Sequence, residues 1–193
     1  MESQTTRNKK EKRARIFKAT IKLITENGLH ATPMAKIAKE ANVAAGTIYI
    51  HFRNKEDLIN QLYLELKGQS VAALTRGLSP SLAVKDGVQL VWNNGLVDRL
   101  KEPIRFRFLQ QYTHSPYIEN VTREEGLKLF HSIIGLWHRG KDDKIIRNID
   151  DLIIYAMLFS PLDALAKQHL QGHFNLEDKK HSVFQSCWDA IKY

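Results

Sequence analysis

The sequence predicts an all-α protein in which a small N-terminal three-helix module is joined to a larger helical domain. Apolar residues return at spacings of three and four along most of the 193 residues, and no segment alternates as a β-strand would. The charge is uneven, because residues 1–55 hold 12 Lys and Arg against 4 Asp and Glu, whereas residues 56–193 hold 17 of each. This excess predicts an N-terminal module attracted to polyphosphate or to an anionic membrane surface.

The chain begins with a polar, basic stretch, and we expect residues 1–9 to form a disordered tail. A helix is expected from Lys10 to about Asn27, since Ile16, Phe17, Thr20, Leu23 and Ile24 would then share one face. Gly28 follows, as glycine often does just beyond a helix end.

Two short helices are expected next. Thr32 and Pro33 resemble an N-cap followed by proline in the first turn, which predicts a helix of about two turns. Asn42 then provides a residue that accepts a left-handed turn, and residues 44–50 can form another short helix. Three helices of this kind predict a helix-turn-helix unit over residues 10–55.

Longer helices are expected in the rest of the chain, and the first of them runs on from the basic module without a flexible linker. Asn54 is expected to begin this helix, with Asp57 as the acid of its capping box. The expected ranges are 54–76, 81–101, 103–114, 122–139, 148–171 and 176–192.

The stretch "VAAGTIYIHFRNKEDL" at 43–58 carries groups suited to a nucleic acid. Gly46 would let the backbone approach a duplex closely, while Thr47 and Tyr49 offer hydroxyls to phosphate oxygens. Lys55 adds charge at the start of the next helix, whose N-terminal amides also favour phosphate.

The segment "GLHATPMAKIAKEANVAAGTIYIHFRNKEDL" at 28–58 resembles the TetR/AcrR-type transcriptional regulator family. Eleven positions fall at the offsets of the family pattern: Gly28, Thr32, Ile37, Ala38, Gly46, Thr47, Tyr49, His51, Phe52, Lys55 and Leu58. The resemblance implies a helix-turn-helix DNA-binding domain fused to a helical effector-binding and dimerisation domain over residues 56–193.

The resemblance also implies roles for individual residues. Thr32 would cap the second helix and touch phosphate, and Ala44, Ala45 and Thr47 would face base edges or nearby backbone. Gly46 would allow the close approach, and Tyr49, His51 and Lys55 would hold phosphates. Alanine cannot donate a hydrogen bond to a base, so sequence specificity is expected to come partly from DNA shape or from the basic run at 7–15. The alternative for that run is a merely solubilising role.

For the larger domain, the resemblance implies a homodimer through residues 148–192 and a pocket for a small-molecule effector of unknown identity. The alternative is that the last two helices, including Phe184, Cys187, Trp188 and Ile191, only close the core of one chain. Pocket residues are expected among aromatic and polar side chains of the middle segment, unless these are ordinary core: Trp92, Phe106, Gln110, Tyr112, His114, His131, Trp137, Phe159 and Asp163.

The function predicted from these features is a ligand-responsive repressor, released by an inducer from a palindromic double-stranded DNA operator. The alternatives are an activator or a ligand-independent regulator of the same family. We expect a cytoplasmic protein without a membrane span, because Cys187 is the only cysteine and the longest apolar segment is interrupted.

We expect no enzyme activity, no cofactor and no metal. Two alternative functions stay open. His169 and His173 lie four residues apart, which would suit a metal-dependent helical enzyme, but Gly172 interrupts the helix and no third ligand is evident. The basic helix at 10–27 would suit a membrane surface or a protein partner, if its apolar face were not needed for the core.

Overall fold

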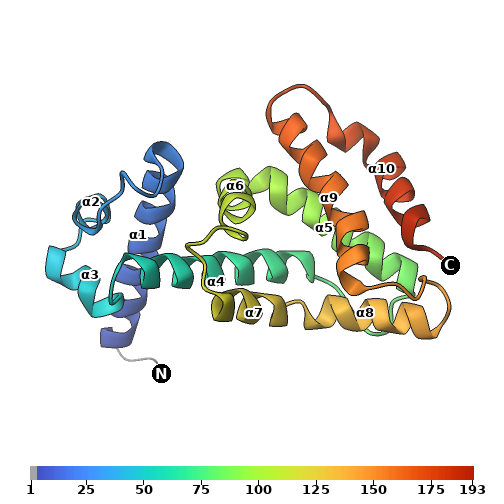
Figure 1. Ribbon diagram of the computed structural model, residues 1–193, viewed down its shortest axis with the longest axis horizontal. Helices are drawn as coiled ribbons and strands as arrows, with labels where there is room; N and C mark the ends of the chain where they lie inside the picture. Colours follow the sequence, from blue (N-terminus) through green and yellow to red (C-terminus); the bar gives the residue numbers. More distant parts are fainter. Residues whose placement is uncertain (1–3) are drawn as a thin grey trace. The chain divides into compact units, whose positions relative to one another are not determined.

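The computed structural model describes residues 4–193, and this part of the chain folds into ten helices and no strand (Figure 1). The predicted all-α fold is therefore confirmed. The helices are α1 (Gln4–Asn27), α2 (Met34–Glu40), α3 (Ala45–His51), α4 (Lys55–Leu74), α5 (Val84–Lys101), α6 (Pro103–Tyr112), α7 (Asn120–Lys128), α8 (His131–Asp142), α9 (Asp151–Leu170) and α10 (Leu176–Ile191). None of these helices is both long and apolar enough to cross a bilayer.

The chain divides into two compact units. The N-terminal unit comprises Met1–Leu66 and Ile104–Arg123, and the C-terminal unit comprises Lys67–Pro103 and Glu124–Tyr193. The sequence predicts a boundary after residue 55 instead. The two divisions differ because α4 contributes its first half to the N-terminal unit, which also receives a segment from much later in the chain.

The core of the N-terminal unit consists of the apolar faces of α1 to α4. Ile16, Ile37, Ile48 and Leu58, one from each of these helices, have no exposed surface. The short α2 and α3 could not bury enough apolar area alone, so this shared core holds them in place.

The later segment is tied to this core by one buried side chain of α4. The Asn60 amide donates to the Tyr117 carbonyl over 3.0 Å, and its Oδ1 accepts from the Glu119 backbone amide over 3.0 Å. Phe108 and Tyr112 of α6 are buried in the same core. These contacts span more than 40 residues of sequence, so no local pattern could predict them.

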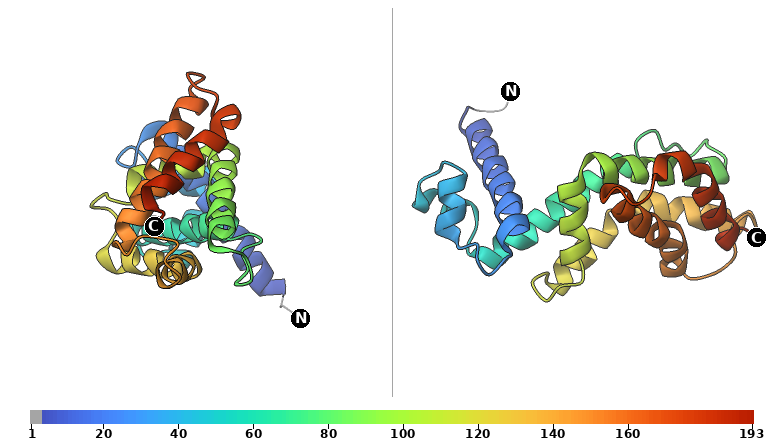
Figure 2. Two further views of the ribbon diagram at one scale, coloured as in Figure 1. Left: turned by 90° about the vertical axis from the view of Figure 1, so that its right-hand side faces the viewer. Right: turned by 90° about the horizontal axis from the view of Figure 1, so that it is seen from above.

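The C-terminal unit is built around α5. Trp92 of α5 has no exposed surface, and its indole donates to the Leu158 carbonyl of α9 over 3.0 Å. The ring of Phe184 in α10 lies 5.6 Å from that of Trp92. Helices α9 and α10 lie side by side, as the orange and red ribbons show in Figures 1 and 2.

The apolar residues of α10 are used inside this unit. Phe184, Cys187, Trp188 and Ile191 are all at most 5 % exposed. The structure therefore supports, for α10, the alternative reading that these residues close the core of a single chain.

Two expected elements differ from the structure. The tail expected over residues 1–9 is helical from Gln4 onward, because no proline or glycine interrupts the run of good helix formers; residues 1–3 lie outside the described residues. The single helix expected over 122–139 is two helices, α7 and α8. They separate at Phe130, whose ring is buried and whose backbone amide bonds to Leu127 in a tighter turn.

Candidate nucleic-acid interface

Helices α2 and α3 are joined by a tight turn. Asn42 has a positive φ of 51°, as expected from its tolerance of the left-handed region. Beyond the turn, Ala44 is extended and α3 begins at Ala45. The predicted cap of α4 is confirmed for Asn54, which accepts from the Asp57 amide over 2.8 Å; Asp57 accepts over 2.8 Å from the Arg53 amide, one residue before the amide that a capping box would use.

One face of α3 is buried and the other is open. Ile48 and the following Phe52 are at most 1 % exposed and hold the helix on the core. Ala44, Ala45 and Gly46 are exposed on the outer side. Tyr49 is 58 % exposed there, so the outer face carries one large amphipathic side chain beside small ones.

Gly46 lies in α3 with ordinary helical geometry. A Cβ at this position would meet nothing within 4 Å, so the fold itself does not require a glycine. Glycine inside a helix destabilises it by about 0.5–1 kcal/mol relative to alanine. The missing side chain leaves the backbone of α3 open at this position to a molecule that approaches from outside.

Thr32 has a different role from the one expected. It is fully buried, and its hydroxyl donates to the Gly28 carbonyl over 2.8 Å, with the Leu23 carbonyl 3.3 Å away. Pro33 is the N-cap of α2, and no side chain caps that helix. The expectation that Thr32 caps α2 is therefore wrong, because its hydroxyl stabilises the end of α1. A phosphate contact by Thr32 stays a prediction, which its complete burial argues against.

Lys55 also has an internal partner. Its ammonium donates to the Leu29 carbonyl, so it joins the start of α4 to the loop between α1 and α2. Partial burial lowers the pKa of Lys55. Tyr117 holds the same loop, since its hydroxyl lies 2.5 Å from His30 Nε2. An ammonium has three donors, so a phosphate contact by Lys55 stays a prediction.

Three cations of α1 act on the C-terminal end of α3. The pKa of His51 is lowered, first by partial burial and then by the charges of Lys9, Arg13 and Lys12. Arg13 also lies over the Phe17 ring, with 4.9 Å from its guanidinium carbon to the ring centroid. We refer to Lys9, Lys12 and Arg13 as the basic face. Its positions share one side of α1, which places positive charge beside the C-terminal end of α3.

The remaining predicted contacts of α3 are partly accessible. Thr47 and His51 are half-buried, so each keeps some surface for a ligand. Sequence reasoning missed Ile50, which is 72 % exposed. The sequence spacing indicates this exposure, because Ile48 and Ile50 are two residues apart on one helix. Two such residues cannot both face the core against which the helix packs.

The nine residues predicted for the effector pocket do not form one cluster within either unit. Phe106, Gln110, Tyr112 and His114 belong to the N-terminal unit, and the other five belong to the C-terminal unit. The aromatic members Trp92, Phe106, Tyr112, Trp137 and Phe159 are all buried. Gln110, His114 and His131 are exposed, whereas Asp163 pairs with Arg99 over 2.5 Å.

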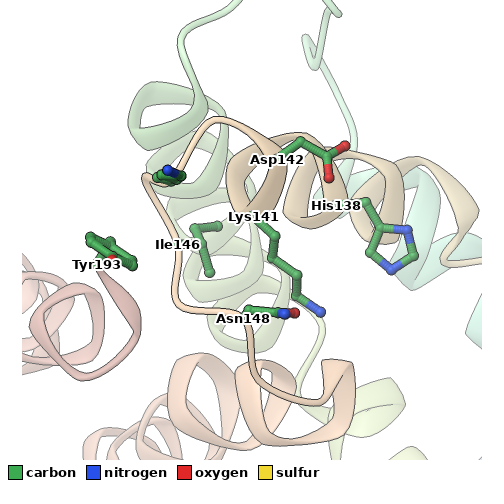
Figure 3. Close-up of a pocket in the computed structure, with 7 residues that line it drawn as sticks. His138, Lys141, Asp142, Ile146, Asn148 and Tyr193 are labelled. Carbon is green, nitrogen blue, oxygen red and sulfur yellow. The ribbon is translucent and has the colours of Figure 1, made fainter.

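Two open pockets lie on the C-terminal unit. The first has a volume of about 560 Å³ and is lined by side chains of α8, the following loop and Tyr193 (Figure 3). Beside it, Asp151 accepts from Lys141 over 2.6 Å and from His138 over 2.8 Å. The second, of about 530 Å³, lies beside Arg139. The lining of neither pocket includes a residue predicted for the effector.

The histidines of the metal hypothesis have other contacts. His169 Nδ1 accepts from the Leu176 amide over 3.2 Å. His173 lies beyond the end of α9, and its Nδ1 is 3.3 Å from Gln168 Oε1. Across residues 4–193, no three His, Cys, Asp or Glu side chains form a group that could hold a metal ion.

An exposed short helix after a tight turn, with a basic face beside it, defines a DNA-binding protein of the helix-turn-helix class. Residues 16–62 match the family described as bacterial regulatory proteins, tetR family, and residues 85–192 match the tetracyclin repressor-like, C-terminal domain. The chain belongs to the tetR family. It is therefore a DNA-binding transcriptional regulator and not an enzyme.

Individual relatives agree with this membership. An HTH-type transcriptional regulator of Haemophilus influenzae is 31 % identical over 178 residues, covering 92 % of this chain and 94 % of the relative. The fold is similar to that of a TetR family transcription regulator from Marinobacter aquaeolei VT8, with a TM-score of 0.89, 24 % identity and coverage of 96 % of this chain and 98 % of that chain. The regulator FadR of Bacillus subtilis, solved in complex with stearoyl-CoA, has a TM-score of 0.72, 23 % identity and coverage of 90 % and 96 %.

Proposed function

We propose that this protein is a cytoplasmic homodimeric repressor that binds a palindromic operator through α3 and is released by a small-molecule effector. The observation that carries the proposal is the open, small-residue face of α3 beside the basic face of α1. A helix with such a face can enter the major groove, because its backbone lies close to the surface.

Each group at the interface has a proposed part. Ala44, Ala45 and Gly46 lie against base edges or the sugar-phosphate backbone, where alanine methyls can contact thymine methyls. Tyr49 and Thr47 donate to phosphate oxygens. The basic face neutralises further phosphates, so much of the affinity is electrostatic and depends on salt.

The proposed dimer uses the exposed side of α9. Leu152, Ile153 and Met157 are 73, 45 and 44 % exposed, although they are large apolar side chains on one helix. Ser160 and Ala164 continue this stripe of α9 and are also exposed. An apolar stripe of this length is typical of a protein–protein contact, and two copies related by a twofold axis would read two half-sites.

The effector response is proposed for the C-terminal unit. Its support is the family membership, together with the likeness to FadR, which was solved with stearoyl-CoA. An effector that binds more tightly to a dimer whose two α3 helices are wrongly spaced for the operator lowers operator affinity. The loss equals the difference between the effector's binding free energies for that dimer and for the operator-competent dimer. Activation instead of repression would follow from the position of the operator in the promoter.

The test of the DNA interface is fluorescence anisotropy with duplexes selected from a random pool, measured over a series of salt concentrations. Lys12→Gln in the basic face is expected to weaken binding to every duplex and to reduce the log–log salt slope by roughly 1. Lys179→Gln on the exposed side of α10 is the matched control and should change neither quantity. Identical slopes for Lys12→Gln and the wild type would contradict the proposed interface.

A further inference from the structure

One lysine of the C-terminal unit has an unusual environment. The Lys67 ammonium of α4 lies 4.8 Å from the centroid of the Phe130 ring. Among the residues that the structure describes, no acceptor lies within hydrogen-bond distance of it. Lys67 keeps part of its surface exposed, but even partial removal of an ammonium from water without a protein acceptor is costly.

Three aromatic rings lead away from this lysine. Phe130 and Tyr155 meet edge-to-face with centroids 6.1 Å apart, and Tyr155 and Phe159 follow with centroids 5.1 Å apart. We refer to Phe130, Tyr155 and Phe159 as the ring series. It connects the start of α8 to two successive turns of α9, and Phe130 is the member that lies beside the Lys67 side chain.

The two ends of the ring series differ in charge. At the far end, the guanidinium carbon of Arg99 lies 5.6 Å from the Phe159 centroid, and Arg99 Nε donates to Asp163 over 2.5 Å. That cation is therefore neutralised by a carboxylate. At the near end, no carboxylate lies within ion-pair distance of Lys67 among the described residues, which leaves one positive charge without a counter-ion.

The charged groups around Lys67 bond to other residues, and two of them act on it from a distance. Burial lowers the pKa of Lys67 to about 8, while Asp163 of α9 acts to raise it and Arg99 of α5 to lower it. Asp98 of α5 accepts from Ser70 over 2.8 Å. Lys67 is therefore still largely cationic at pH 7 and available to an anion.

We infer that Lys67 and the ring series form the anchoring end of a site for an apolar monoanion, a carboxylate on an aromatic or aliphatic body. The carboxylate would pair with the Lys67 ammonium, and the body would lie against the rings. One unneutralised cation suits a single negative charge, whereas a cationic ligand would be repelled by Lys67. The site is accessible, since Lys67, Tyr155 and Asp163 each keep part of their surface exposed.

This inference rests on the proposed function only in treating the ligand as the effector; the binding itself is independent of DNA. The test is isothermal titration calorimetry on the full-length protein with 2-naphthoate and decanoate, each compared with its uncharged amide. The carboxylates are expected to bind roughly tenfold or more tightly than the amides, as for other charge-assisted contacts. Lys67→Met should remove this preference while leaving amide binding in place.

A second readout separates an ion pair from a structural role. At about pH 8.5 the wild type should take up protons on binding a carboxylate, because the anion raises the pKa of Lys67; titrations in buffers of different ionisation enthalpy measure this uptake. Lys67→Arg should bind the carboxylates without proton uptake, and Lys179→Met, on exposed α10, should behave as the wild type. Circular dichroism verifies that each variant is folded.

Three results would contradict the proposed anion site. They are no binding of either carboxylate to the wild type at millimolar concentration, equal affinities for carboxylates and amides, and an undiminished preference of Lys67→Met for carboxylates over amides. The effector role is tested separately by adding the bound carboxylate to the protein–operator complex. Unchanged operator affinity would contradict that role and leave the anion site standing, whereas a protein that never binds DNA would contradict the proposed function alone.

Discussion

Replacing Lys67 by methionine should stabilise the protein, and the gain should depend on pH. The pKa of Lys67 falls from its ordinary value of 10.5 to about 8 in the folded chain. Each tenfold change in a dissociation constant corresponds to about 1.4 kcal/mol, so burying the charged ammonium destabilises the fold by about 3 kcal/mol. Methionine has a similar length and keeps the contact with Phe130, but it carries no charge.

The direction of the pH dependence follows from linkage. The unfolded chain holds the Lys67 proton more tightly than the folded chain, so this group makes the free energy of unfolding rise with pH. The penalty is fully present below about pH 8 and disappears as the pH approaches 10.5. The free energy of unfolding of Lys67→Met is therefore expected to exceed that of the wild type by about 2–3 kcal/mol at pH 7. The difference should become progressively smaller at higher pH.

Urea denaturation followed by circular dichroism measures this difference, at one fixed protein concentration because a dimer gains stability by mass action. Lys179→Met, which removes an exposed lysine of α10, serves as the control and should stay close to the wild type throughout. A Lys67→Met protein less stable than the wild type at pH 7, or a difference in stability that does not change up to pH 10, would contradict a charged, partly buried Lys67.

Two further substitutions test individual contacts. Thr32→Val should lower the free energy of unfolding by about 1–2 kcal/mol, because the Gly28 carbonyl loses its hydroxyl donor, while operator affinity at a temperature where the variant is folded stays unchanged. A large loss of affinity without a loss of stability would restore Thr32 as a DNA contact. Leu152→Glu should convert the dimer to a monomer in multi-angle light scattering, whereas Leu127→Glu, at a leucine that is 63 % exposed on α7, should leave the mass unchanged. A dimeric Leu152→Glu would place the interface elsewhere.

Local signals explain what the sequence could predict. The helix-turn-helix, the left-handed Asn42 and the Asn54 cap of α4 all depend on residues within a few positions of one another. Their geometry is a property of short segments, so spacing and residue type identify them. The open face of α3 follows in the same way, because the helical period separates its buried residues from its exposed ones.

Non-local packing explains what the sequence could not predict. The segment 104–123 joins the N-terminal unit through Asn60, whose partners lie more than 50 residues away. Thr32 is a suitable N-cap by type, yet burial turns its hydroxyl toward the end of α1. Lys67 is one lysine among many in the sequence, and only the Phe130 ring that the fold brings beside it distinguishes it.

The operator affinity of Gly46→Ala reports whether the open face of α3 lies against DNA. A methyl group at Gly46 meets nothing within 4 Å in the protein, and the same is true of Gly135 in α8. Both Gly46→Ala and Gly135→Ala should therefore gain about 0.5–1 kcal/mol of stability. We predict that Gly46→Ala alone loses operator affinity, by roughly tenfold, the equivalent of about 1.4 kcal/mol. Wild-type affinity in a stabilised Gly46→Ala protein would contradict the placement of α3 against DNA.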